Sequence, residues 1–532
     1  MTTTLLRGGR VRTPADPFAT ALLMDGDTVV WVGSDAAAAA LSADVTVELA
    51  DAWVAPAFVD AHVHATGTGL ALTGLDLTDA PSLAVALSRV ESAARDARGG
   101  AVLGTGWDDT RWPERRAPTA AELDRASYGG VVYLARTDVH SAVVSSALLA
   151  AAPQARAMQG FLADGLVRQD AHHELRRSAY AAISAGQRAA ARRVTLDRAA
   201  ELGIACVHEC GGPQIAGEQD FLDLLALDHV VQRVGYWGEL DGIERAQSLG
   251  ARGAAGDLFA DGALGSHTAC LSAPYADSHA ADPHDAGFGY LDAAQVCAHV
   301  MACTEAGLQA GFHAIGDAAL TSVLDGFTEA GVRLGADALR RRRHRVEHAE
   351  MLTPAHIATM ADLGIIASVQ PAFDARWGGP DGMYAERLGP ERARGMNPYA
   401  ALAAAGVPLA LGSDTPVTPL DPWGTVRAAV QHRTTGSGLS ARAAFAAHTR
   451  GGWRAGGDDS GGELVPGAPA TFAIWQVEGE LVVQTPDDRL AGWSTDARAG
   501  VSGLPDLAGP DPVCLSTVVT GVPHRADWPN FC

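Results

Sequence analysis

The chain lacks the cysteine pattern of a disulfide scaffold or of a zinc knuckle. Its 532 residues include 7 cysteines, an odd number without a repeated spacing. Cys206 and Cys210 lie close together, but no second pair follows them, so a structural zinc site built on cysteine is not expected. We expect most of these thiols to be small buried apolar side chains.

Positive charge and long apolar runs are also scarce. The formal net charge is −22, and such a surface offers no basic face for nucleic acid or anionic lipid. The N-terminal segment has no apolar stretch typical of a secretory signal, and no later run reaches the length of a membrane span. These absences predict a cytoplasmic protein with no nucleic-acid or membrane partner.

The remaining composition is that of a globular protein, with 47% hydrophobic and 19% charged residues. Both ends of the chain alternate short apolar runs with turn signals, such as "MDGD" near the start. The same alternation of apolar runs and turn signals recurs after a segment rich in Gly and Asp that begins near residue 455. This pattern predicts a small sheet domain formed by residues 1–54 together with residues 455–532.

Residues 55–454 alternate strand-like apolar runs with long Ala-rich stretches of helical periodicity. Eight such runs, from "AFVDAHVH" to "VPLALGSD", are the number that a closed parallel (β/α)8 barrel requires. The fourth is "GDLFADG". A ninth run at 129–140 does not fit, so we assign it to an insertion over residues 66–195 after the first barrel strand. The basic cluster Arg341–Arg345 is interpreted as a solvated helix end.

Side chains with the chemistry of metal ligands follow several of these strands. His62 and His64 end the first strand one pleat apart, so both point the same way. His313, His348 and Asp414 end the fifth, sixth and eighth strands. Catalytic residues of such barrels lie at the C-terminal ends of the strands, so these five side chains should meet at one mouth. Imidazole plus carboxylate, without thiolate, is the ligand mix of a catalytic zinc site.

The chain resembles the amidohydrolase superfamily, specifically its amidohydrolase-3, YtcJ-like group, nearly from end to end. The matching segments include "PAFVDAHVH", "LFADGALGSHTACLSAPYAD", "FHAIGDAAL", "RVEHAE" and "LALGSDTPVTPLDPW". The resemblance implies an α/β fold, a metal-bearing TIM-like barrel with a composite β-sandwich of both termini. It also implies hydrolysis of a carbon–nitrogen bond other than a peptide bond, as in N-substituted amides, formamides or cyclic amides.

The resemblance also assigns roles to individual positions. His62 and His64 match the pair that holds the more buried metal. His313 and His348 match two histidines that hold a second metal or divide into a ligand and a catalytic group. Asp414 matches the aspartate that contacts the metal and carries the proton of a metal-activated water to the leaving amine. The expected cofactor is one or two divalent ions, with zinc first and manganese or iron as alternatives.

The sequence departs from the group where many relatives carry a lysine that is carboxylated to bridge two metals. Asp257 stands there, and an aspartate carboxylate is several ångströms shorter than a lysine carbamate. Asp261, on the same strand face, could supply the carboxylate instead, and Glu209 is a further candidate. These departures favour one metal, with His348 as catalytic partner and with the ligands His62, His64, His313 and Asp414.

The insertion is expected to cap the barrel mouth and to line a small-molecule pocket. Phe373 lies near a position where relatives often place a histidine, which favours an aromatic wall. His172 and His173 lie in a helical stretch with polar neighbours and are expected to be exposed. The candidate substrate-binding residues are Trp107, His140, His267, Gln370 and Phe373.

Other functions could use the same site. A deaminase acting on aminated heterocycles, or a lactone or ester hydrolase, also begins with hydroxide attack on an sp² carbon. A barrel that had lost its metal would be a binding module, but the retained ligand set disfavours this reading. Large barrels of this kind often form symmetric homodimers, and that base rate is the only indication of assembly.

Overall fold

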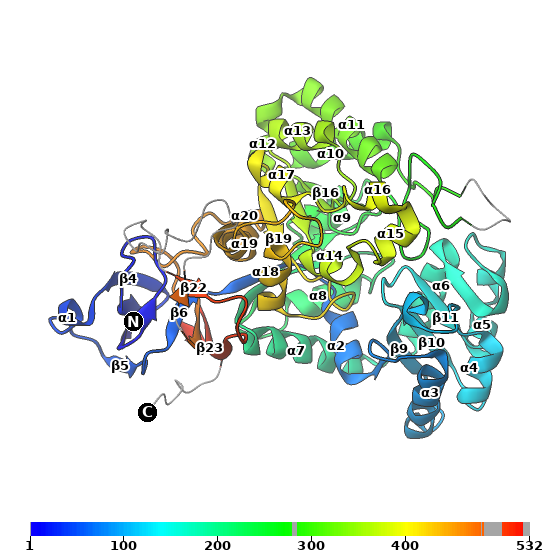
Figure 1. Ribbon diagram of the computed structural model, residues 1–532, viewed down its shortest axis with the longest axis horizontal. Helices are drawn as coiled ribbons and strands as arrows, with labels where there is room; N and C mark the ends of the chain where they lie inside the picture. Colours follow the sequence, from blue (N-terminus) through cyan, green and yellow to red (C-terminus); the bar gives the residue numbers. More distant parts are fainter. Residues whose placement is uncertain (1, 279–284, 480, 483–502, 525–532) are drawn as a thin grey trace.

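The computed structural model describes residues 2–278, 285–479, 481–482 and 503–524. Along its longest axis, a small β-rich unit lies at one end, the barrel in the middle and the insertion at the other end (Figure 1). Within the described ranges, no helix is both long enough and apolar enough to cross a lipid bilayer.

Eight parallel strands form the barrel sheet, in the order β19-β18-β17-β16-β15-β14-β13-β7. The sheet closes between its two outer strands, where the Asp414 N–H donates to the His62 carbonyl at 2.8 Å. The predicted (β/α)8 barrel is confirmed. Its strands are β7 (Phe58–Val63), β13 (Ile204–Gly211), β14 (Gln232–Trp237), β15 (Gly253–Ala254), β16 (Gln309–Ala314), β17 (Arg345–His348), β18 (Ile366–Val369) and β19 (Leu409–Leu411).

Helices connect the successive strands and cover the outside of the barrel. Their apolar faces bury residues such as Leu320, Val323 and Phe327 of α11 against the sheet, as expected for an amphipathic surface helix. The connecting helices include α7 (Ala185–Glu201), α8 (Glu218–Leu225), α9 (Ile243–Ser248), α10 (Ala293–Ala306), α11 (Asp317–Leu334), α13 (Pro354–Leu363) and α17 (Tyr399–Ala404), and α18 (Pro422–Val430) follows the last strand.

The fourth barrel strand differs from its prediction. The run "GDLFADG" was predicted as a strand over 256–262, but the strand is β15, which ends at Ala254. Gly256 adopts a left-handed φ of 81°, which turns the chain out of the ladder. Phe259 then pairs with His313 only through an isolated bridge. Asp257 therefore lies on an irregular segment and not within a regular strand.

Two sheets built from both ends of the chain form the predicted composite β-sandwich, which is confirmed. Their orders are β4-β3-β1-β5 and β2-β6-β20-β23-β24. Leu6 and Leu22 of the first sheet pack with Val54, Phe472 and Ile474 of the second in one buried cluster. The strands are β1 (Thr3–Arg7), β2 (Arg10–Val11), β3 (Ala21–Asp25), β4 (Thr28–Gly33), β5 (Val45–Glu48), β6 (Trp53–Pro56), β20 (Phe472–Gln476), β23 (Val513–Val519) and β24 (Val522–Pro523).

The insertion after β7 forms a sheet of its own, in the order β12-β11-β10-β9-β8. The ninth apolar run of the sequence supplies its central strand, β10. Helix α6 packs on this sheet and faces the barrel mouth (Figure 1). The elements are β8 (Leu75–Asp76), α3 (Leu83–Ala97), β9 (Val102–Trp107), α4 (Ala120–Ala126), β10 (Val132–Arg136), β11 (Ser141–Val144), α5 (Ser146–Ala151), β12 (Leu166–Arg168) and α6 (Gln169–Ala181).

Arg345 is buried, contrary to the solvated helix end predicted for the basic cluster. The cluster begins at the end of helix α12 (Ala336–Arg342), but Arg345 is the first residue of β17 and is 0% exposed. Its guanidinium pairs with the Glu347 carboxylate and lies 4.3 Å from the centroid of the Tyr236 ring. Because strand side chains alternate, Arg345 and Glu347 point together into the barrel.

His344 precedes β17 and is locked in its neutral form. Its Nδ1 accepts the Ala310 N–H at 2.8 Å. Its Nε2 lies 3.0 Å from Thr304 Oγ1, whose own proton goes to the Val300 carbonyl, so Nε2 carries the imidazole proton. Burial, with a smaller contribution from nearby cationic groups, lowers the pKa of His344 to about 3.

We expect the free energy of unfolding to fall on acidification, because the unfolded chain takes up a proton that folded His344 cannot. This contribution is complete above about pH 6.5 and is lost as the pH falls towards the folded pKa, with a loss of ~3 kcal/mol near pH 4.5. Urea unfolding of the wild type and of His344→Gln measures it, since glutamine can make both hydrogen bonds without titrating. Equal losses in the two proteins would contradict the assignment.

Candidate metal centre

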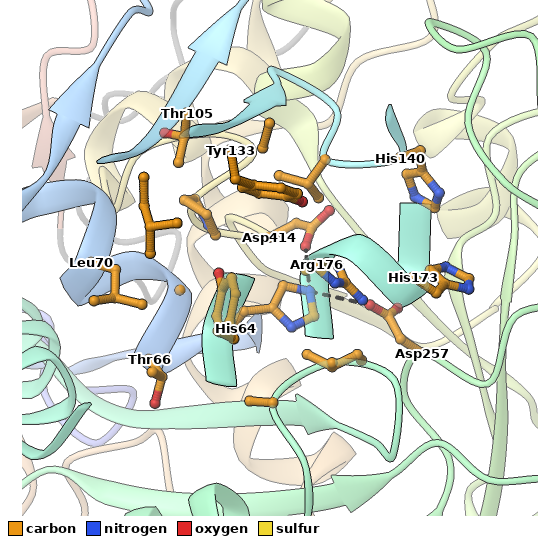
Figure 2. Close-up of a pocket in the computed structure, with 18 of the residues that line it drawn as sticks. His64, Thr66, Leu70, Thr105, Tyr133, His140, His173, Arg176, Asp257 and Asp414 are labelled. Carbon is orange, nitrogen blue, oxygen red and sulfur yellow. Dashed lines mark ion pairs between the residues drawn. The ribbon is translucent and has the colours of Figure 1, made fainter. Parts of the chain in front are cut away.

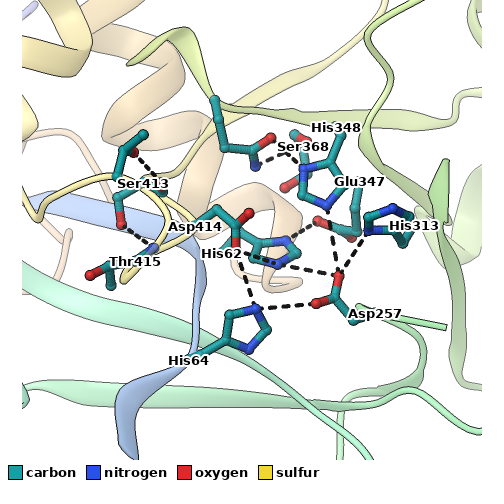
Figure 3. A network of polar contacts seen from close by, with 12 residues as sticks. His62, His64, Asp257, His313, Glu347, His348, Ser368, Ser413, Asp414 and Thr415 are labelled. Carbon is teal, nitrogen blue, oxygen red and sulfur yellow. Dashed lines mark hydrogen bonds and ion pairs between the residues drawn. The ribbon is translucent and has the colours of Figure 1, made fainter. Parts of the chain in front are cut away.

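The strand ends bring the five predicted side chains together (Figure 3). His62 and His64 come from the end of β7, His313 from β16, His348 from β17 and Asp414 from the segment after β19. His62 Nε2 and His64 Nε2 lie 3.4 and 3.2 Å from Oδ1 of Asp414. The ring centroids of His313 and His348 are 4.4 Å apart. We call these five residues and Asp257 the metal cluster.

Asp257 lies at the centre of the metal cluster. Its Oδ1 is 3.4 Å from His62 Nε2 and 3.6 Å from His313 Nδ1. The same oxygen is 3.8 Å from His348 Nε2, and Oδ2 is 3.1 Å from His64 Nε2. The sequence suggested that this carboxylate would stop short of the other ligands, but the irregular segment after β15 places it among all four imidazoles. The chain contains no lysine at any position, so a carboxylated lysine cannot form in it.

The two other candidate carboxylates are bonded to backbone N–H groups. Glu209 accepts the Ala65 N–H at 2.8 Å, and burial raises its pKa to about 7. Burial also raises the pKa of Asp261, to about 6. Because its lone pairs are used, Asp261 supports the loop rather than offering a free ligand. The N–H groups that it accepts, at 2.9, 3.0 and 2.7 Å, belong to Cys270, Ile315 and Gly316.

Hydrogen bonds determine which nitrogen of two histidines faces the centre of the cluster. His62 Nδ1 lies 2.9 Å from Glu347 Oε2, and Arg345 Nη2 donates to the same oxygen at 2.9 Å. His313 Nε2 lies 3.1 Å from the Gly262 carbonyl. Both partners are acceptors, so the contacting nitrogen carries the proton. The opposite nitrogen, Nε2 of His62 and Nδ1 of His313, therefore faces the cluster and is the atom that can bind a metal once its proton is released.

Gln370 and Phe373, both predicted to touch the substrate, contact His348. Gln370 is fully buried, and its Oε1 lies 2.9 Å from His348 Nδ1, so it orients His348 and does not line a cavity. Phe373 stacks on His348 with ring centroids 5.9 Å apart and an interplanar angle of 10°. The Phe373 ring also lines a cavity beside the cluster.

Buried polar atoms without partners test whether the cluster fits a metal. Leaving such an atom unpaired costs about 1–3 kcal/mol. Nitrogen and carboxylate oxygen atoms of this kind are the donors that zinc and related divalent ions prefer. The residues therefore fit a divalent metal. Among the described residues, the cluster atoms without a hydrogen-bond partner are His62 Nε2, His64 Nδ1, Asp257 Oδ1, His313 Nδ1 and Asp414 Oδ1.

Opposite charges are concentrated within the metal cluster. Burial lowers the pKa of His62, but Cys210, Asp257 and Asp414 outweigh it and raise that pKa well above its usual value. Burial would raise the pKa of Asp257, but the histidines around it, His62 first, hold that pKa well below its usual value. The negative charge of these carboxylates stabilises protons on the neighbouring histidines, and the same charge attracts a metal cation.

Two cavities open from the metal cluster. The larger one lies between the barrel mouth and the insertion, and Figure 2 shows His64, Asp257 and Asp414 on its wall. The smaller one lies beside helix α14 (Pro371–Trp377), which follows β18, and is lined by aromatic residues, including Phe373 and Trp377. Both cavities are lined by His140, His313, His348 and Asp414.

Of the three other pocket residues predicted from the sequence, only His140 lines a cavity. Burial and the nearby His313 lower the pKa of His140 well below its usual value. Trp107 is 1% exposed and donates its Nε1–H to the Leu134 carbonyl at 2.8 Å, because it belongs to the hydrophobic core of the insertion. His267 lies outside both cavities, with its Nε2 3.0 Å from Asp277 Oδ1.

Helix α6 supplies pocket residues that the sequence did not predict. His172, expected to be exposed, is 1% exposed, and its Nε2 lies 2.8 Å from the Tyr133 hydroxyl. His173, also expected to be exposed, lines the larger cavity with Arg176 and Tyr180. The spacing of these three residues by three and four positions was the available signal, because it places them on one helix face.

Comparisons with known proteins agree with this geometry. The amidohydrolase family model matches residues 45–523. The chain is 29% identical over 450 residues to protein LONG AFTER FAR-RED 3 of Arabidopsis thaliana, across 78% of this chain and 75% of that protein. It is 26% identical over 459 residues to N-substituted formamide deformylase of Arthrobacter pascens, across 78% and 81% of the two chains.

A solved structure shows the same fold. The uncharacterized metal-dependent hydrolase of Pyrococcus horikoshii matches with a TM-score of 0.71 and 24% identity, across 91% of this chain and 98% of that chain. The matched family segment includes every barrel strand and every residue of the metal cluster. The chain therefore belongs to the amidohydrolase family, and it is a hydrolase.

Proposed function

We propose that this hydrolase cleaves a carbon–nitrogen bond of amide type, other than a peptide bond, in a small molecule. The observation that carries the proposal is the convergence of unpaired donor atoms from His62, Asp257, His313 and Asp414 beside two cavities. The name of the Arthrobacter pascens relative, an N-substituted formamide deformylase, supports the choice of an amide-type bond.

Asp257 is proposed as a ligand shared by two divalent ions. It belongs to two groups of side chains whose ligand atoms lie within 4.8 Å of one another, one with His62 and His64 and the other with His313 and His348. This arrangement replaces the single-ion version favoured by the sequence, because one carboxylate contacts the histidines of both groups. Zinc is proposed as the ion, since imidazole and carboxylate donors suit it.

A divalent ion bound there would polarise the carbonyl group of the substrate and lower the pKa of the attacking water. Asp414 is proposed to accept the proton of that water and to return it to the departing nitrogen, because its carboxylate borders both cavities. His140, kept neutral by burial, can exchange a hydrogen bond with the substrate from the insertion side. The insertion covers the mouth and limits access of bulk water to the reacting bond.

The test is a hydrolysis screen of the zinc-loaded enzyme over N-acyl amines, formamides, lactams, lactones and aminated heterocycles. We expect turnover in at least one of the first three classes, measured as amine release or ring opening. Ammonia release from the heterocycles alone would identify a deaminase, and turnover of lactones alone would identify a lactonase. Protein that retains less than about a tenth of an equivalent of metal after growth with zinc would instead favour a binding module.

A further inference from the structure

Helix α6 presents polar side chains to the larger cavity. His173, Arg176 and Tyr180 are spaced by three and four residues, so they lie on one face of the helix. All three line the cavity that also contains His64 and Asp257. Figure 2 draws His173 and Arg176 on the same side of this space as Asp257. The helix therefore brings a guanidinium and a phenol group to the wall of the larger cavity.

Arg176 has few partners within the protein. Its Nη2 donates to the Gln214 carbonyl at 2.6 Å, while its Nε is buried without a hydrogen-bond partner. It forms no ion pair with any carboxylate in the described part of the chain. The adjacent Arg177, in contrast, is largely exposed and pairs with Glu174 of the same helix. A guanidinium that lines a cavity without a carboxylate partner is suited to an anion that enters from outside.

Away from the metal cluster, the described residues that line the larger cavity carry no positive charge besides Arg176. Among the described residues that line it, Arg176 is the one guanidinium, and burial lowers the pKa of His173 to about 3. The carboxylates of Asp257 and Asp414 contact the histidines of the metal cluster, which leaves Arg176 free of them. Most of the other lining is apolar and includes Leu70, Leu103, Val139, Ile215, Phe259 and Pro416.

We propose that Arg176 and Tyr180 bind a carboxylate group of the substrate, and that an apolar spacer joins this group to the scissile amide. The inference rests on the proposed hydrolysis at the metal cluster, because the larger cavity runs from α6 to that cluster. The smaller cavity opens on the other side of the cluster and receives the second arm of the amide, next to Phe373 and Trp377. The substrate class is thus an N-acylated amino acid or a related amide with one anionic end.

Kinetics on matched substrates test the assignment. The probes are N-formyl and N-acetyl ω-amino acids of increasing chain length, each compared with its neutral methyl ester. We expect the wild type to prefer the acid, and Arg176→Gln to lose about 10- to 100-fold in kcat/KM on the acid, the usual effect of one charge-assisted hydrogen bond. The ester should change less than about threefold. Arg176→Lys should recover part of the activity on the acid, and Arg177→Gln is the matched control with no change.

Equilibrium binding separates this inference from the proposed hydrolysis. Hexanoate should raise the thermal unfolding midpoint of the wild type and of Arg177→Gln but not of Arg176→Gln. Hexan-1-ol should change the midpoint of all three proteins by the same amount. If hexanoate binding depends on Arg176 but no amide is hydrolysed, the carboxylate site is supported and the proposed reaction is contradicted. If the wild type hydrolyses acid and ester at equal rates, and if Arg176→Gln and Arg176→Lys do not change these rates, the carboxylate site is contradicted. The proposed amide hydrolysis would still be supported.

Discussion

Asp414→Asn should keep the fold and lose about 100- to 10,000-fold in kcat on any amide that the wild type hydrolyses. The amide has the size of the carboxylate but cannot accept the proton of the attacking water, and general-base catalysis is worth about that factor. Asp414 has a φ of 53°, and asparagine tolerates this left-handed conformation, so the substitution adds no backbone strain. The loss should therefore appear in the chemical step and not in the yield of folded protein.

The measurement is steady-state kinetics with bound zinc quantified in the same preparation. Asp421→Asn is a matched control, because Asp421 follows the same barrel strand, lies outside both cavities and caps helix α18, a role that asparagine also fills. It should retain wild-type turnover. If Asp414→Asn kept more than about a tenth of the wild-type kcat with its zinc in place, Asp414 would not be the proton carrier.

Asp257→Ala should abolish the binding of two ions, because it removes the one carboxylate that contacts the histidines of both candidate groups. We expect zinc titration of the metal-free wild type to saturate at about two equivalents of zinc per chain. In Asp257→Ala the stoichiometry should fall to about one or fewer, and the affinity of any remaining site should weaken by ~100-fold or more. Calorimetric titration, together with metal analysis after dialysis, measures both quantities.

Glu209→Gln is the control for the metal titration. Glu209 also lines the larger cavity, but its carboxylate accepts the Ala65 N–H and contacts none of the cluster histidines at ion-pair distance. Its replacement should leave the stoichiometry at about two. Saturation of the wild type near one equivalent would restore the single-ion version. An unchanged stoichiometry in Asp257→Ala would show that other residues hold both ions.

The barrel and the five strand-end residues could be predicted because both follow from regular structure. A strand has a side-chain period of two, so His62 and His64 must point the same way, and parallel strands end at one mouth. The reach of Asp257 could not be predicted in this way. It depends on the turn at Gly256, where a left-handed glycine ends β15 and carries the next residue over the mouth. The short side chain of Asp257 therefore suggested, wrongly, that its carboxylate could not reach the histidines of the cluster.

The pocket was harder to predict because its wall comes from the insertion. Whether Trp107 or Arg176 faces the substrate depends on how the insertion docks on the barrel, and no local pattern encodes that orientation. Trp107 was predicted for the pocket on its residue type, but its indole fills the core between α3 and the insertion sheet. The domain boundaries, the cytoplasmic location and the homodimer stay predictions.

The lack of lysine has a consequence for how the centre is assembled. A carbamate ligand must be made after translation from a lysine and dissolved carbon dioxide, so its formation depends on gas supply and on pH. Here the central carboxylate belongs to Asp257 and is present as soon as the chain is synthesised. A metal centre built on Asp257, as proposed above, would therefore need no carbon dioxide for its assembly.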